Sequence, residues 1–319
     1  MSKTKRKKMQ GFNPTLVGLS KPEASHHIVA HPSGWVSEAK PAIAITLGDP
    51  TGICPEIVKK AISDKSVLKI CRPVVIGTST KFVPGFPTRK SDKAAVSFLI
   101  RAVKLIKNEK VDAIVTAPVA KSAFGKLGGH TEFLAKKTCS KNVEMLMVAE
   151  DKKVLLLTRH IPLKDVSKNI SKEKIVKSTK SVCEFIKKYF RIKKPKIIIC
   201  GLNPHCGDNG LVGTEEKKKI IPAIKILKKR GLDVAGPVNP EVAFLDMKSD
   251  LVVCMYHDQA MLPLKLLNPD KIVNVTVGLP FIRTSPGHGT AYDIAGKNRA
   301  NPQPMIEAIK LACLLTKNN

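Results

Sequence analysis

Short apolar segments alternate with longer amphipathic segments from residue 42 to the C-terminus. The apolar segments read as buried strands, and they lie at 42–50, 73–79, 112–118, 144–150, 153–159, 196–202, 251–257 and 272–278. Apolar residues recur with helical spacing in the segments between and after them, at 93–109, 174–190, 215–230 and 305–317, and a helix also begins at Pro55. Strands that alternate with helices are typical of a parallel sheet covered on both faces. The sequence therefore predicts an α/β fold.

The chain is strongly basic, with a formal net charge of +29 over 319 residues. Most of the excess is lysine on the polar faces of the predicted helices, where a solvated surface explains it. Aromatic residues make up only 4% of the chain and no nucleic-acid reading motif is present. We therefore expect no specific nucleic-acid partner, although a phosphorylated substrate would be attracted by the positive field.

Residues 1–40 differ from the rest of the chain, because a basic run is followed by Pro, Gly, Ser and His without periodicity. A disordered or loosely docked tail is the default interpretation. No segment approaches the ~20 apolar residues of a membrane span, and the N-terminus lacks the apolar core of a signal peptide. The eight cysteines form no C-x-x-C pair, which fits a reducing compartment. We expect a cytoplasmic protein without a membrane partner.

Three histidines, His160, His205 and His257, each follow a predicted buried strand. The ends of parallel strands converge on one crevice, so these side chains could be ligands of one metal ion with positions left open for substrate. Each histidine alone is more readily a hydrogen-bonded loop residue, and it is their shared position after buried strands that favours a metal site. Asp258 could orient a ligand or move a proton, or could be a turn residue. Cys206, beside His205, is more readily a packing residue.

Cations and hydrogen-bond donors form a second set of candidates. The loop GDPTGICPE follows the first strand but is not G-x-G-x-x-G, so the standard dinucleotide fingerprint is absent. The segment from Gly278 to Pro302 combines an arginine with glycine turns around His288, which is too elaborate for a plain connector. Six side chains could clamp a phosphate or carboxylate: Lys121, His130, Thr131, Lys265, Asn274 and Arg283.

Six motifs in order resemble the 4-hydroxythreonine-4-phosphate dehydrogenase family of pyridoxal 5′-phosphate biosynthesis. They are ITLGDPTGICPEI, VTAPVAK, GHTEFLA, GLNPHCGDNGLVGTEE, MYHDQAMLPLK and VNVTVGLPFIRTSPGHGTAYDIAGK. The resemblance runs from about Pro41 to the C-terminus. HGTAYDIAGKNRANP also looks like the nucleotide loop of isopropylmalate and isocitrate dehydrogenases.

The resemblance implies a homodimer of subunits with two α/β/α domains and active sites shared in the interdomain cleft, as in isocitrate and isopropylmalate dehydrogenases. The first domain would comprise 41–128 plus 297–319, and the second 129–296. By the same match, His160, His205 and His257 would bind zinc, magnesium or cobalt. His130, Thr131, Lys265, Asn274 and Arg283 would contact substrate. The adenosine side of NAD, or of NADP, would lie on His288, Gly289, Thr290, Asp293 and Asn301.

The implied reaction is the oxidation of 4-phosphohydroxy-L-threonine to 2-amino-3-oxo-4-phosphooxybutanoate, which decarboxylates to 3-amino-2-oxopropyl phosphate. The group that takes the hydroxyl proton is open among Lys121, His130 and Asp258. A sister dehydrogenase of 4-phospho-D-threonate or 4-phospho-D-erythronate is the alternative. A basic nucleic-acid-binding protein and an inactive relative are further alternatives, and the intact histidine set and substrate clamp argue against both.

The chain departs from the family pattern at a few places. Cys54 stands where the family usually has glycine, and Glu241 stands where aspartate is expected. The first domain is short between its second strand and the helix at 93–109. These departures bear on the substrate and the cofactor more than on the fold.

Overall fold

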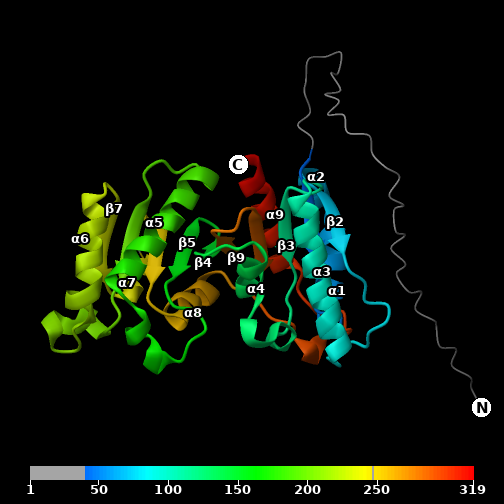
Figure 1. Cartoon of the computed structure of the whole chain (residues 1–319), viewed down its shortest axis with the longest axis horizontal. Helices are drawn as coiled ribbons and strands as arrows, with labels where there is room; N and C mark the ends of the chain where they lie inside the picture. Colours follow the sequence, from blue (N-terminus) through cyan, green and yellow to red (C-terminus); the bar gives the residue numbers. More distant parts are fainter. Residues whose placement is uncertain (1–39, 246–247) are drawn as a thin grey trace, which may run out of the picture.

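A computed structural model of the chain describes residues 40–245 and 248–319 (Figure 1). Its strands form a ten-stranded sheet in the order β2-β1-β3-β10-β9-β4-β5-β8-β6-β7. The strands are β1 (Ala42–Thr46), β2 (Arg72–Ile76), β3 (Ala113–Thr116), β4 (Glu144–Ala149), β5 (Lys152–Leu156), β6 (Lys196–Cys200), β7 (Asp233–Val238), β8 (Leu251–Cys254), β9 (Ile272–Val277) and β10 (Ile282–Pro286).

The sheet consists of two parallel blocks joined by antiparallel strands. The first block is β2-β1-β3-β10 and the second is β5-β8-β6-β7. Strands β9 and β4 lie between the blocks, and β9 is antiparallel to both β10 and β4 while β4 is antiparallel to β5. Strands from both predicted domains therefore share one hydrogen-bonded sheet.

Helices cover both faces of this sheet (Figure 1). They are α1 (Cys54–Ile62), α2 (Lys65–Ile70), α3 (Arg89–Lys107), α4 (His130–Lys137), α5 (Lys172–Tyr189), α6 (Ile221–Lys229), α7 (Pro240–Leu245), α8 (His257–Leu267) and α9 (Gln303–Lys317). Local sequence explains several starts: Pro55 occupies the first turn of α1, Thr88 and Ser91 form a capping box on α3, and Ser171 caps α5. In the described ranges, no helix is both long and apolar enough to cross a bilayer.

One face of the sheet carries a continuous apolar core. Alternate strand residues such as Ile45, Val115, Val275 and Leu155 join it, and helices α1, α5, α6 and α9 pack against it. The opposite face carries two separate cores. One lies under α3 and α4, and the other lies under α7 and α8. The central strands β10 and β9 run between those two cores.

The α/β class is confirmed, with the predicted apolar segments forming β1 to β6, β8 and β9. Strands β7 and β10 and helices α2, α4, α7 and α8 were not expected. Strand β10 lies in the segment that we interpreted as a binding loop. Its sequence IRTSP has three consecutive polar residues and so lacks the continuous apolar run of a buried strand. The division into two domains stays a prediction. The tail predicted at 1–40 lies outside the described residues except for Lys40.

Candidate functional site

Polar side chains replace the apolar core where β10 and β9 cross the face that carries two cores. Arg283 of β10 is only 2% exposed. Its Nε and Nη2 donate to the hydroxyl of Thr116 at 3.2 and 2.6 Å, and its Nη1 donates to the hydroxyl of Thr276 at 2.9 Å. Hydroxyls accept hydrogen bonds but do not neutralise the guanidinium, and burial lowers the pKa of Arg283 to about 10. A buried cation that no described carboxylate contacts directly is suited to binding an anion.

Two unpaired polar atoms accompany this cation. His130 Nε2 and Asn274 Oδ1 are buried and have no hydrogen-bond partner within the described residues. The ring of His130 lies 4.9 Å from that of Phe124. Burial, and secondarily the charge of Arg283, holds the pKa of His130 well below 6.5, so the ring is neutral. Because buried polar atoms are normally paired, we interpret these two as ligand contacts. Thr131, the next residue of α4, is 4% exposed.

The three predicted metal ligands follow neighbouring strands. Strands β5, β8 and β6 are adjacent and parallel, so His160, His257 and His205 leave the sheet at one edge, as predicted. The rings of His160 and His257 have centroids 5.6 Å apart. His257 Nδ1 lies 2.6 Å from the Asp258 carboxylate. Burial first, and then the charges of Lys121 and His257, lowers the pKa of His160, so its ring favours the neutral form that binds metals.

Two buried side chains hold the histidine loops in place, and sequence reasoning missed both. Gln259 Oε1 accepts from the Met255 N–H at 2.6 Å, and its Nε2 donates to the Gly201 carbonyl at 2.8 Å. Gln259 thus joins the loop after β8 to the loop after β6. Its partner Gly201 lies 58 residues away in the sequence, so no local sequence signal reveals this contact.

The second of these side chains is Glu216, which anchors the loop that carries His205. Its Oε1 accepts from the N–H groups of Leu202 and Asn203, both at 2.8 Å. The residues from His205 to Asn209 all have positive φ, an unusual backbone that needs such support.

The three predicted ligands do not meet at one point in the described part of the chain. Among the described residues, no three His, Cys, Asp or Glu side chains lie close enough together to hold a metal ion. The structure brings His160 and His257 together, and it places the His205 loop on the neighbouring strand. The metal site stays a prediction.

The remaining candidates lie on the segments around these groups. Lys121 begins a short 3-10 segment, Lys121–Leu127, and its charge acts on His160. Lys265 is exposed in the last turn of α8, where it lines a cavity of about 120 Å³ together with His288. Asp258 is engaged with His257. Lys121 and Asp258 were the two residues expected to be catalytic. Asp258 contacts His257 and is therefore suited to positioning that histidine.

The segment predicted to bind the nucleotide, from His288 to Asn301, packs against the loop that follows β1 and contains Asp49 and Ile53. The Tyr292 hydroxyl donates to Asp49 at 2.5 Å, and the Ile53 N–H donates to the Thr290 carbonyl at 2.9 Å. A Cβ on Gly52 would lie 2.7 Å from that carbonyl oxygen, so this close approach requires glycine. His288 Nε2 is buried without a partner among the described residues.

The other residues of this predicted nucleotide segment differ in environment. Gly289 and Asp293 are exposed, whereas the Asn301 side chain already accepts from the Gln303 N–H at the start of α9.

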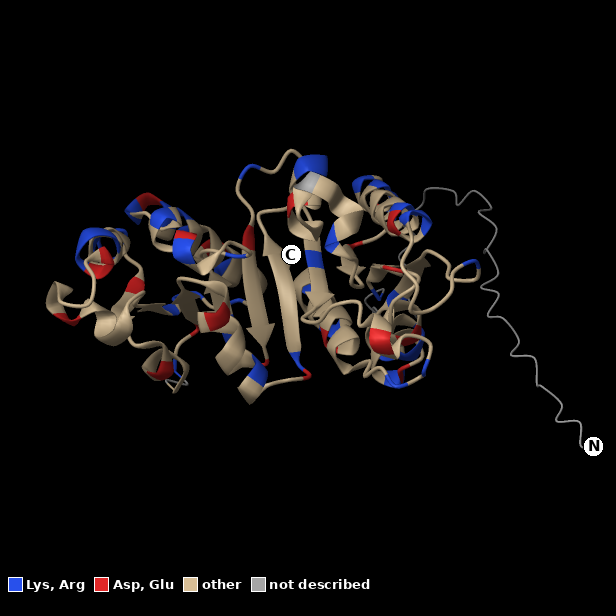
Figure 2. Ribbon diagram, turned by 90° about the horizontal axis from the view of Figure 1, so that it is seen from below, with Lys and Arg blue, Asp and Glu red and all other residues tan. Residues whose placement is uncertain are grey.

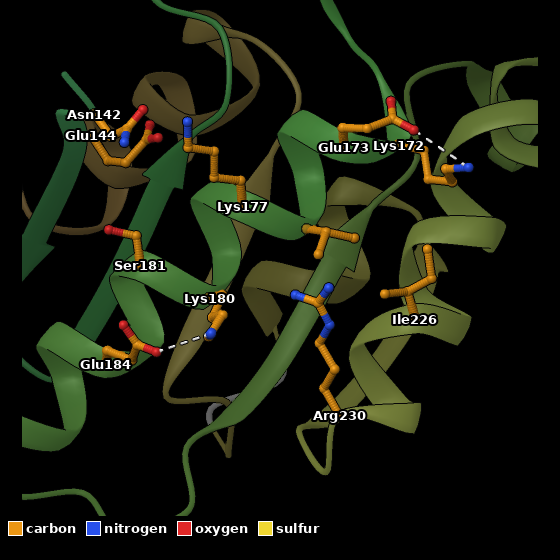
Figure 3. A pocket seen from close by; sticks show the side chains of 11 residues that line it. Asn142, Glu144, Lys172, Glu173, Lys177, Lys180, Ser181, Glu184, Ile226 and Arg230 are labelled. Carbon is orange, nitrogen blue, oxygen red and sulfur yellow. Dashed lines mark ion pairs between the residues drawn. The ribbon is translucent and has the colours of Figure 1, made fainter.

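A groove of about 640 Å³ lies elsewhere, between α5 and α6 (Figure 3). Glu144, Lys177 and Arg230 contribute to its walls, and Lys180 pairs with Glu184 at 3.6 Å. None of the residues predicted from the sequence lines this groove. In the ribbon of Figure 2, the positions of Lys and Arg are spread over many helices together with those of Asp and Glu, as expected for a solvated surface.

Strand-end histidines and a buried arginine that no described carboxylate contacts are features typical of enzyme sites for small anionic molecules. Residues 36–312 match the family model described as pyridoxal phosphate biosynthetic protein PdxA. The chain belongs to this family, and it is an oxidoreductase.

The similar proteins cover most of the chain. The 4-hydroxythreonine-4-phosphate dehydrogenase of Sulfurihydrogenibium sp. is 41% identical, over 86% of this chain and 98% of that protein. The D-threonate 4-phosphate dehydrogenase of Cupriavidus necator is 38% identical, over 86% and 97%. The structure of a putative 4-hydroxythreonine-4-phosphate dehydrogenase from Salmonella typhimurium superposes with a TM-score of 0.75 at 35% identity, covering 87% of this chain and 100% of that one.

Proposed function

We propose that this enzyme oxidises 4-phosphohydroxy-L-threonine to 2-amino-3-oxo-4-phosphooxybutanoate, with NAD and a divalent metal ion, in pyridoxal 5′-phosphate biosynthesis. The product then decarboxylates to 3-amino-2-oxopropyl phosphate. The observation that carries the proposal is the buried Arg283 guanidinium, whose described hydrogen-bond partners are all hydroxyls. The family and the names of the similar proteins support the substrate.

The anionic end of the substrate binds at Arg283. His130 Nε2 and Asn274 Oδ1 have unmet hydrogen-bonding capacity beside it, and the neutral His130 ring adds no second charge. Thr131 can donate a further hydrogen bond. Lys265 lies in a cavity with His288, where it extends the positive field toward the cofactor segment.

The donor set fits a divalent metal ion, because neutral imidazoles are its commonest protein ligands. His160, His205 and His257 would hold the ion. When bound, the ion would polarise the substrate hydroxyl, and NAD would accept the hydride. His257 Nδ1 donates a hydrogen bond to the Asp258 carboxylate, which leaves Nε2 of that ring for ligation. Lys121 stays a candidate for proton transfer.

A homodimer with shared active sites completes this ligand set. Helix α8 exposes Leu262, Leu266 and Leu267, and α7 exposes Val242 and Leu245. Large apolar side chains that gather on neighbouring helices favour burial against a partner. A second copy of the chain at this surface would lie next to the histidine loops, since α8 begins at His257.

NAD binds at the segment from His288 to Asn301, with His288, Gly289, Thr290 and Asp293 facing its adenosine side. The buried, unpartnered Nε2 of His288 supports this role. NAD is favoured over NADP on the family resemblance. We place the enzyme in the cytoplasm, which fits its eight free cysteines.

A dehydrogenase of 4-phospho-D-threonate or 4-phospho-D-erythronate is the second candidate. The 38% identity to the Cupriavidus necator protein favours it, because that protein is named for D-threonate 4-phosphate. The two candidates share the metal and phosphate sites, and they differ in the substituent at C2, which is an amine in one substrate and a hydroxyl in the other.

Turnover distinguishes the candidates. NADH formation is measured with 4-phosphohydroxy-L-threonine and with 4-phospho-D-threonate, each with and without a chelator. We expect the first substrate to have the higher kcat/KM and the chelator to abolish turnover. Preference for the hydroxy acid would select the second candidate.

The metal site has its own test. His205→Ala should lose bound metal and activity while remaining folded, and full activity without metal would refute the metal site.

A further inference from the structure

Glu132 places a carboxylate among the cations of the candidate site. It lies in the first turn of α4, two residues after His130. Its Oε1 is 3.8 Å from Arg159 Nη2. Burial lowers the pKa of Arg283, and the negative charge of Glu132 offsets part of that lowering. The carboxylate therefore lies close to the anion site and also contacts Arg159, the residue before His160.

The Glu132 carboxylate forms an ion pair with Arg159 but keeps hydrogen-bonding capacity for a ligand. The 3.8 Å contact with Arg159 is too long for a hydrogen bond. Arg159 instead donates to the Val143 carbonyl at 3.1 Å through Nη1. The Glu132 side chain is 42% exposed, and no described group donates a hydrogen bond to it. Asp258, by contrast, already contacts His257 at 2.6 Å.

The charges of the proposed substrate match this arrangement. The phosphate and carboxylate of 4-phosphohydroxy-L-threonine suit Arg283 and the surrounding cations, whereas its C2 ammonium requires an anion. We propose that Glu132 binds this ammonium group, a proposal that rests on the proposed function. Glu132 would thereby set the preference for a 4-phosphorylated acid with an amine at C2 over one with a hydroxyl at C2. Glu132 is a specificity-determining residue in this proposal.

The physical basis is the difference between a charged and a neutral contact. An ammonium donates charge-assisted hydrogen bonds to a carboxylate, which are about twice as strong as those from a neutral hydroxyl. A glutamine keeps the shape and one acceptor but removes the charge. Glu132→Gln should therefore weaken binding of the amine far more than binding of the hydroxyl.

The test compares kcat/KM for 4-phosphohydroxy-L-threonine and 4-phospho-D-threonate in wild type and Glu132→Gln. We expect the ratio of the two values to fall at least tenfold in the variant. An equal loss on both substrates would overturn the proposal. Wild-type turnover of the amino acid separately decides the proposed function, so the two failures are distinguishable.

Three matched variants complete the test. Arg159→Gln should leave the substrate ratio within twofold, and a tenfold change there would mean that Glu132 acts only through Arg159, contrary to the proposal. Asp258→Asn should lower both kcat/KM values by the same factor, whereas a selective loss of the amine would assign ammonium binding to Asp258 instead. Glu132→Asp retains the charge and should keep part of the preference, even if the Gln variant folds poorly.

Discussion

The two faces of the central strands differ in what they carry. On one face, Val275 of β9 and Val115 of β3 belong to a core that continues beneath α1, α9, α5 and α6. On the other face, Thr276 and Thr116 accept hydrogen bonds from Arg283, and the apolar cores stop on either side. Successive side chains of a strand point to opposite faces, so neighbouring residues of one strand serve stability and ligand binding separately.

This separation implies that the two roles respond to different substitutions. A change on the continuous core should affect folding, and a change on the interrupted face should affect binding. The predictions below test that contrast, from the largest expected effect to the smallest.

The largest effect is expected from Arg283→Met. Removal of the buried cation should lower kcat/KM by about a thousandfold, a loss comparable to that of a key electrostatic contact. The free energy of unfolding should change by less than about 1 kcal/mol, because replacing a buried charge with an apolar side chain of similar volume is often neutral or stabilising. Steady-state kinetics and urea denaturation provide the two measurements. Unaltered kinetics would contradict the role of the interrupted face.

The matching variant on the continuous core is Ile45→Ala. Ile45 is fully buried, so we expect a loss of about 2 to 5 kcal/mol in the free energy of unfolding. The kcat of the protein that remains folded should be unchanged. A large fall in kcat at full foldedness, judged by circular dichroism, would show that the two faces are not separable.

A smaller effect is expected from Gln259→Leu. The variant leaves the Met255 N–H and the Gly201 carbonyl without their side-chain partner, at a cost of about 1 to 3 kcal/mol. Metal affinity, measured by competition with a chelator, should also weaken because two histidine loops lose their connection. Gln259→Glu serves as the control that keeps the acceptor and loses the donor, and equal metal affinity in all three proteins would rule out the positioning role.

The smallest effect concerns pH. Burial lowers the pKa of His130 in the folded chain, so the unfolded chain takes up a proton first. Stability should therefore be independent of His130 above pH 6.5 and should fall as the pH drops below that value, by up to about 1.4 kcal/mol per pH unit. His160 and His288 have lowered pKa values as well and share this loss. His130→Asn should reduce the slope by one proton, as measured by urea denaturation between pH 5 and 7.

The sequence predicted the strands that precede the three histidines better than the central strand β10. The strands before His160, His205 and His257 were identified because each is an unbroken apolar run, buried on both faces. Strand β10 was missed because Arg283 and Thr284 interrupt its hydrophobic pattern. Arg283 was predicted to clamp an anion, but its place inside the sheet depends on hydroxyls of β3 and β9, which lie far away in the sequence.

Other features depend on contacts that no sequence pattern encodes. Gln259 and Glu216 bind backbone atoms of remote loops. The role proposed for Glu132 depends on its position near Arg159 and Arg283, which lie far from it in the sequence. The joining of the two predicted domains was also not foreseen, since it rests on the antiparallel pairing of β9 with β4 and β10.

The shared sheet also limits how the enzyme can move. A hydrogen-bonded ladder runs without a break from β2 to β7, so its two blocks cannot swing apart about a flexible linker without breaking strand pairs. The 3-10 turn at Lys121–Leu127 and the loop at His205 lie outside this ladder. Arg283, by contrast, lies on β10, which is paired with β3 on one side and with β9 on the other, so strand pairing on both sides fixes the backbone that carries the cation.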